Sequence, residues 1–185
     1  MRVKWLWMSA LAALVAGCGQ GHAIFIVDVY SFIQGTGGAT IPYFIPPSAT
    51  PPGIDSASST PQRINLPGAG SSFIDSVLVK GKVDLENQSG TGTIGLKLFL
   101  AADSAGTFNS SALALTVPDS AVSGTRTTPD TIIGRFNASV IQLLAGSQVW
   151  FRLQAKGTNP GLSLVQGNAV VKSLQLTVVI TDQLF

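Results

Sequence analysis

The chain of 185 residues has few of the residues on which enzymes and metal sites depend. It contains one cysteine and one histidine, and Asp, Glu, Lys and Arg together make up only 11% of it. A single cysteine excludes an internal disulfide, and zinc sites need several Cys or His ligands. The lone histidine, His22, cannot join a catalytic triad unless the fold returns to it. We therefore expect no catalytic residue, no metal, no cofactor and no enzymatic activity.

Carboxylates are also scarce, at nine in the whole chain. The sequence does not exclude that two of them face each other across a cleft, as the catalytic carboxylates of glycosidases do. Asp84 and Glu86, however, alternate with apolar residues and follow Lys80 and Lys82, which is typical of a solvated strand face. Asp103 and Asp119 lie in predicted loops and could bind Ca²⁺. Neither loop has the dense spacing of acidic residues that a dedicated calcium site needs.

The N-terminus carries the most specific pattern in the chain. Arg2 and Lys4 precede an apolar run over residues 5–16, and the segment ends in Val15-Ala16-Gly17-Cys18. A basic start, a short apolar run and small residues indicate a secretory signal. The last four residues resemble the lipobox of bacterial lipoproteins. The resemblance covers residues 1–18 and implies cleavage before Cys18, a lipid such as palmitate on Cys18, and a membrane as the partner of that lipid.

Two alternatives remain for this segment. One is an ordinary signal peptide cut elsewhere, and the other is an uncleaved membrane helix. The apolar run is shorter than the roughly 20 residues that a spanning helix needs. If residues 1–17 are removed, residues 18–22 form a tether. Gly19, rather than an acidic residue, follows Cys18. The resemblance then implies anchorage at the outer membrane if the host has one, and otherwise on the outer face of the cell membrane.

The net charge of the chain gives no support for a nucleic-acid partner. Removal of Arg2 and Lys4 with the signal lowers the number of basic residues from 11 to nine, which equals the number of acidic ones. The basic pI of the full chain therefore gives no evidence for a nucleic-acid partner, and we expect none. The 168 remaining residues suit one domain, which we place at residues 23–185.

Alternating apolar residues, punctuated by Gly and Pro, predict an all-β fold. In residues 73–86, Val77, Val79, Val83 and Leu85 share one face. We expect about seven strands in an immunoglobulin-like β-sandwich, with the second and third paired as a hairpin and a helical turn over residues 138–146. The predicted strands cover residues 23–33, 73–86, 92–101, 112–117, 131–137, 148–156 and 169–181.

Residues 34–72 differ from the rest because they hold seven of the ten prolines. Proline cannot donate to a central ladder, so the sequence predicts a long loop or arm. Two readings stay open: a loop draped over the sandwich, or an arm that binds a partner protein. Tyr43 and Phe44 favour docking of residues 39–47, whereas the Ser-rich residues 55–60 are expected to stay undocked.

Trp150 and Arg152 are the remaining candidates for a site. Both fall on the polar side of the predicted strand 148–156, where an outward Trp could stack on a sugar ring. The alternative is that residues 41–45 cover Trp150. We expect a non-enzymatic lipoprotein with a structural, assembly or protein-interaction role at the cell envelope, where an envelope protein is the candidate partner. The competing hypothesis is a carbohydrate- or small-ligand-binding module.

Overall fold

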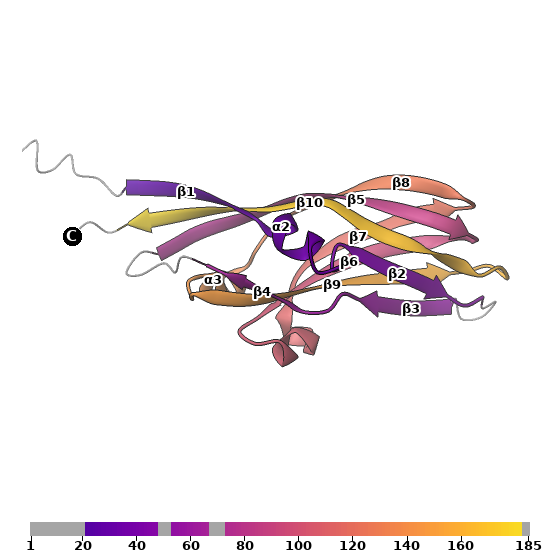
Figure 1. The fold of residues 1–185 in the computed structure, drawn as a ribbon, viewed down its shortest axis with the longest axis horizontal. Coiled ribbons are helices and arrows are strands. Elements are labelled where there is room, and N and C mark those ends of the chain that lie inside the picture. Colours follow the sequence, from indigo (N-terminus) through magenta and orange to yellow (C-terminus); the bar gives the residue numbers. More distant parts are fainter. Residues whose placement is uncertain (1–20, 48–52, 67–72, 183–185) are drawn as a thin grey trace, which may run out of the picture.

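In a computed structural model, which describes residues 21–47, 53–66 and 73–182, the chain is a sandwich of two antiparallel β-sheets (Figure 1). The all-β sandwich predicted from the alternation of apolar residues is confirmed. The described elements are β1 (Gly21–Asp28), α2 (Val29–Gln34), β2 (Thr40–Ile45), β3 (Gly53–Ser58), β4 (Gln62–Asn65), β5 (Phe73–Ser89), β6 (Thr91–Ala101), η1 (Ala105–Phe108), η2 (Ser110–Ala112), β7 (Leu113–Ser123), β8 (Arg126–Arg135), α3 (Ala138–Leu144), β9 (Gln148–Asn159) and β10 (Val165–Asp182).

The strand order is that of a jelly roll. One sheet runs β1-β10-β5-β8, with β2 also paired to β10, and the other runs β3-β9-β6-β7, with β4 also paired to β9. β1 and β2 occupy successive stretches of β10, and β3 and β4 occupy successive stretches of β9. β1 and β2 together therefore act as one interrupted strand, and so do β3 and β4. Counted in this way, the described sandwich has eight strands in two four-stranded layers. The last strand, β10, lies beside the first, whereas an immunoglobulin domain puts its last strand in the opposite sheet.

The proline-rich segment contributes strands to both sheets. β2 pairs with β10, and β3 and β4 pair with β9. The expectation that residues 55–60 stay undocked is wrong, because β3 pairs with β9 and the Ser59 backbone N–H donates to the Leu153 carbonyl at 2.9 Å. β2, β3 and β4 lie at the outer side of their sheets, where a proline does not interrupt a ladder on both sides.

Two other local expectations are corrected. β5 and β6 do not form a hairpin, because β5 pairs with β8 and β10 while β6 pairs with β7 and β9 in the other sheet. Alternation shows which face of a strand is buried, but not which sheet contains it. The strand predicted over 23–33 ends at Asp28, and α2 follows, with Val29 and Ile33 one helical turn apart and buried.

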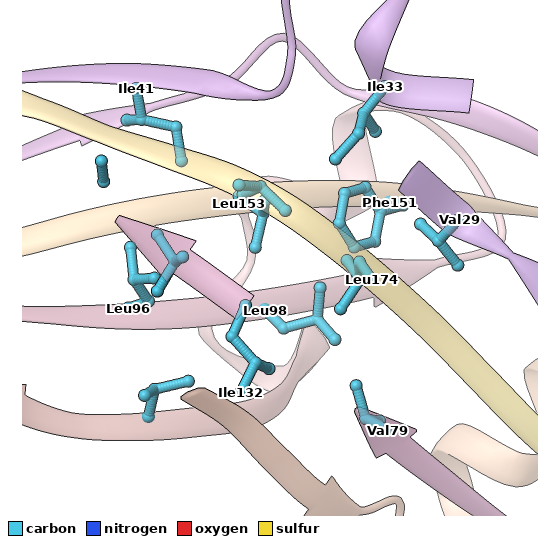
Figure 2. Packing of buried hydrophobic residues seen from close by; sticks show 14 of the residues in the cluster. Val29, Ile33, Ile41, Val79, Leu96, Leu98, Ile132, Phe151, Leu153 and Leu174 are labelled. Atoms are coloured by element: carbon cyan, nitrogen blue, oxygen red, sulfur yellow. The ribbon is translucent and has the colours of Figure 1, made fainter. Parts of the chain in front are cut away.

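The core lies between the two sheets. Figure 2 shows Phe151 and Leu153 of β9 facing Leu174 of β10 and Ile132 of β8. These four side chains are at most 2% exposed. The helical turn expected near 138–146 is confirmed as α3, whose N-cap Asn137 accepts a hydrogen bond from the Val140 N–H at 3.0 Å.

Candidate functional site

Arg152 is the centre of a polar cluster on the outer face of the β3-β9-β6-β7 sheet. The side chain projects from β9 on the side opposite the core, yet it is only 3% exposed. Its Nε and Nη2 donate to the Thr107 carbonyl oxygen at 3.0 and 2.8 Å, and its Nη1 donates to Ser58 Oγ at 2.6 Å. The guanidinium therefore links β9 to both β3 and η1.

Two phenyl rings enclose the same guanidinium. Its central carbon lies 4.1 Å from the centroid of Phe99 and 4.6 Å from that of Phe108. Both distances are within the range of cation–π attraction. Burial lowers the pKa of Arg152 below its ordinary value, and no carboxylate forms a salt bridge with it among the described residues. Two rings, one backbone carbonyl and one hydroxyl, rather than an acid, stabilise this charge.

The turn that covers Arg152 is held by its own hydrogen bonds. Asp103 Oδ1 accepts from the Gly106 N–H at 2.7 Å, and Thr107 Oγ1 donates to the Ser104 carbonyl at 2.7 Å. Thr107 is fully buried, whereas Phe108 is 61% exposed. Asp103, weighed above as a Ca²⁺ ligand, thus accepts a backbone hydrogen bond. In residues 21–47, 53–66 and 73–182, no three His, Cys, Asp or Glu gather as a metal site would require.

A hollow of about 260 Å³ opens beside this cluster. Lys97, Gln154 and Ser110 supply its polar lining, and Phe108 borders it. Small-molecule pockets range from about 300 Å³ upward, so this hollow has room for no more than a small ligand or one sugar ring. It can offer a cation, an amide and an aromatic ring to such a ligand.

The structure places the two residues predicted at this site, Trp150 and Arg152, in different environments. Trp150 and Arg152 do share the outer face of β9, but Arg152 is buried and its donors are engaged by Thr107 and Ser58, while Trp150 is half-buried. The register partners of Trp150 are Arg63 on β4 and Ala101 on β6. Residues 41–45, expected to cover Trp150, pair instead with β10 in the other sheet. Sequence reasoning missed Thr107 and Phe108, because the fold brings η1 to β9 across 45 positions.

Tyr43 and Phe44, the candidates in the arm, point to opposite sides of β2. Tyr43 is 4% exposed and Phe44 is 57% exposed. The Tyr43 hydroxyl donates to Asn87 Oδ1 at 3.1 Å. Burial, together with the nearby negative charge of Glu86, raises the pKa of Tyr43 to about 12. The expected packing against the sandwich therefore holds for Tyr43, while Phe44 faces solvent.

A second hollow, of about 350 Å³, lies around Phe44. Gln88, Gln166 and Asn168 line it with amides, and Pro42 and Ala57 add apolar surface. This lining suits a peptide or protein contact better than a charged ligand, because it offers amide hydrogen bonds beside an exposed ring.

Cys18 lies outside the described residues. In the part of the chain that the structure describes, no helix is long and apolar enough to cross a membrane.

Comparisons with known proteins add little beyond the fold. No protein-family model matches the chain, and no curated protein matches it. Among solved structures, it is similar to infectious bursal disease virus, Gx strain, with 11% identity and a TM-score of 0.48, over 89% of this chain and 33% of the viral chain. The Gt strain structure matches with 9% identity and a TM-score of 0.49, over 86% and 35%.

A structure of TmCBM61 in complex with β-1,4-galactotriose also matches, with 10% identity and a TM-score of 0.30, over 86% of this chain and 88% of that chain. This chain spans about a third of the length of the two viral chains. At TM-scores below 0.5, none of these likenesses says what this chain does.

Proposed function

We propose that this chain is an exported lipoprotein, anchored through Cys18, whose jelly-roll domain has a non-enzymatic structural, assembly or protein-interaction role at the cell envelope. The observation that carries the proposal is the closeness of the lipobox-like segment to the first strand. β1 begins at Gly21, three positions after Cys18. Three extended residues reach about 10 Å, which would hold the domain against the membrane surface. More than one acyl chain makes such an anchor stable.

Substitution of Cys18 tests the anchor. In bacterial cells fed an alkyne-labelled palmitate analogue, wild-type protein should carry the label and sediment with membranes. Cys18→Ser should carry none and should leave the membrane fraction or accumulate with its signal attached. Gln20→Ala, two positions further on, is the matched control and should behave as wild type. A wild-type protein without label would contradict the anchor.

The exposed ring of Phe44 supports the protein-interaction role. Phe44 lies on β2 beside the amide-lined hollow, and both the ring and the hollow are open to solvent in the folded domain. A photoreactive phenylalanine at position 44 should cross-link to one discrete envelope partner in cells. The same probe at Ile133, a 65% exposed residue on β8, is the control. Identical smears from both positions would contradict a specific partner at Phe44.

A second candidate function is binding of a carbohydrate or another small ligand. The observation that favours it is the hollow beside Arg152, where Phe108 is exposed next to Lys97 and Gln154. Isothermal titration calorimetry of the domain from residue 18 onward with monosaccharides and oligosaccharides tests it. Binding that Phe108→Ala abolishes and Lys156→Ala preserves would favour this candidate. Absence of saturation at millimolar sugar would reject it.

A further inference from the structure

The end of the sandwich next to Gly21 carries an unusual concentration of exposed apolar side chains. Ile24, Phe25 and Ile26, successive residues of β1, are 67%, 46% and 67% exposed. Phe73, at the start of β5, is 62% exposed. Alternation normally places every second residue of a strand in the core, so three exposed apolar neighbours show that both faces of β1 are open here. We call Ile24, Phe25, Ile26 and Phe73 the apolar tip.

The strand register gathers these residues at one end of the molecule. Thr181 of β10 pairs with His22 on one side and with Phe73 on the other, so the start of β1 and the start of β5 flank the end of β10. In Figure 1 these three strand ends extend beyond α3 and β4, on the side opposite the end of β2. The tip is therefore a three-stranded extension beyond the sandwich rather than a patch on its side.

The tip is also poor in charge. There is no Asp, Glu, Lys or Arg in residues 21–27 of β1 or in residues 173–181 of β10. Asp182, the register partner of Gly21, is the one charged residue at the end of β10. On the adjoining part of β5, residues 73–79, Asp75 is the single charged residue. Exposed apolar side chains gathered at one end of a domain, with little charge among them, are typical of a contact with a membrane or a protein.

The length of chain before β1 decides between these occupants. Cys18 is three positions from Gly21, so a lipid on Cys18 lies within about 10 Å of the start of the tip. A bilayer that holds this lipid is then already at the tip, while a protein partner would have to enter the same narrow space. Apolar and aromatic side chains favour the boundary between headgroups and acyl chains.

We propose that the apolar tip inserts into the interfacial region of the bilayer that holds the anchor, and so fixes the orientation of the jelly roll on the membrane. This inference rests on the proposed lipid anchor. The tip acts as a second membrane contact beside the lipid. With that end held in the interface, the end that carries Phe44 faces away from the membrane.

Quenching of tryptophan by brominated lipid tests the insertion. The lipid-modified protein carrying Phe25→Trp, purified from membranes, is reconstituted into vesicles of phosphatidylcholine, with or without bromine on the acyl chains, and the signal of the parent protein is subtracted. We expect roughly a two-fold loss of the added emission in brominated vesicles, because an inserted ring lies at the acyl boundary. Phe44→Trp, a similarly exposed position at the opposite end, is the matched control and should not be quenched.

A second set of variants separates the tip from the anchor. Ile24→Asn with Ile26→Asn, added to Phe25→Trp, should abolish the quenching, whereas Ile133→Asn should not. Lipid labelling of the same preparations reports the anchor independently. Labelled protein without quenching at position 25 would overturn insertion and leave the anchor intact. Emission that is shifted to shorter wavelength but not quenched by bromine would mean that protein, including a second copy, covers the tip, and would also overturn it.

Discussion

At the scale of single residues, polar side chains tie loops to the sandwich mainly through backbone carbonyls. Arg152 binds the Thr107 carbonyl, and Asn87 Nδ2 donates to the carbonyl oxygens of Ser89, Gly90 and Gly124. Asn159 Nδ2 likewise donates to the carbonyls of Ile45 and Ser163. Each of these side chains is at most 3% exposed. Because buried carbonyls need donors, these residues fix the course of the chain where the strands end.

Replacement of Arg152 should loosen the turn above it. Arg152→Met leaves the Thr107 carbonyl without its donor and removes the cation–π contacts, so we expect a loss of about 2–4 kcal/mol of unfolding free energy. Arg152→Lys should recover only part of this, because an ammonium cannot reproduce the planar fork. Lys156→Met, an exposed neighbour on the same face, is the control. Urea unfolding and amide exchange at Thr107 measure the effect; unchanged exchange in Arg152→Met would contradict it.

The Tyr43 hydroxyl should make stability fall at alkaline pH. Its pKa is raised from 10.0 to about 12 in the folded protein, so the unfolded chain releases the proton first as pH rises. Unfolding free energy should therefore decline between pH 10 and 12, by up to about 2–3 kcal/mol. Tyr43→Phe should lack this part of the decline. In the variant Tyr30→Phe, Tyr43 is the one remaining tyrosine, so the pH titration of tyrosinate absorbance measures its pKa. A titration midpoint near pH 10 in the folded protein would contradict the prediction.

At the scale of elements, the proline-rich segment shows how an edge strand tolerates proline. β2 alternates exposed and buried residues, with Ile41, Tyr43 and Ile45 buried and Pro42 facing out. It pairs with β10 along one side. This single row of hydrogen bonds lets a segment rich in proline complete the sheet.

Substitutions in β2 should separate its two faces. Ile41→Ala removes a fully buried side chain, so we expect a loss of about 2–5 kcal/mol. Phe44→Ala, on the exposed face, should stay within about 0.5 kcal/mol of wild type. Urea denaturation measures both. In limited proteolysis, wild-type residues 40–45 should resist an aromatic-specific protease, and rapid cleavage there would contradict docking of β2.

The turn between β5 and β6 should depend on glycine more strongly than the turn between β7 and β8. Gly90 and Gly124 both have positive φ, at 71° and 55°. A Cβ on Gly90 would collide with the Leu164 carbonyl oxygen, whereas one on Gly124 would meet open space. Gly124→Ala should lose about 1–2 kcal/mol through left-handed strain alone, and Gly90→Ala should lose clearly more. Equal losses in urea unfolding would contradict the collision.

At the scale of the whole molecule, both sheets share one core, so the domain should unfold as a unit. Pairing of β1 with β10 and of β3 with β9 joins segments far apart in the chain. In the protein without residues 1–17, where Trp150 is the one tryptophan, we expect far-UV circular dichroism and tryptophan fluorescence to follow one urea transition. Refolding should take milliseconds to seconds because the contacts of the fold are non-local. Two separated transitions would show that the sheets unfold independently.

Local patterns in the sequence determined the all-β class, the inward faces of β5, β9 and β10, and the helical turn of α3. These properties depend on the alternation of neighbouring residues and on one capping residue, Asn137. The lipobox-like segment is equally local, and it remains the basis of the proposed anchor.

Tertiary structure alone decided the partner of each strand. The alternation in β5 and β6 is the same whether they pair with each other or lie in opposite sheets, because both arrangements bury the same face. Likewise, the sequence placed Arg152 outside the core. Only the tertiary fold brings η1, 45 positions away in the chain, over Arg152 and buries its side chain. The apolar tip appears only when the ends of β1, β5 and β10 are brought together. Long-range pairing depends on the total free energy of the fold, which no short segment of the sequence contains.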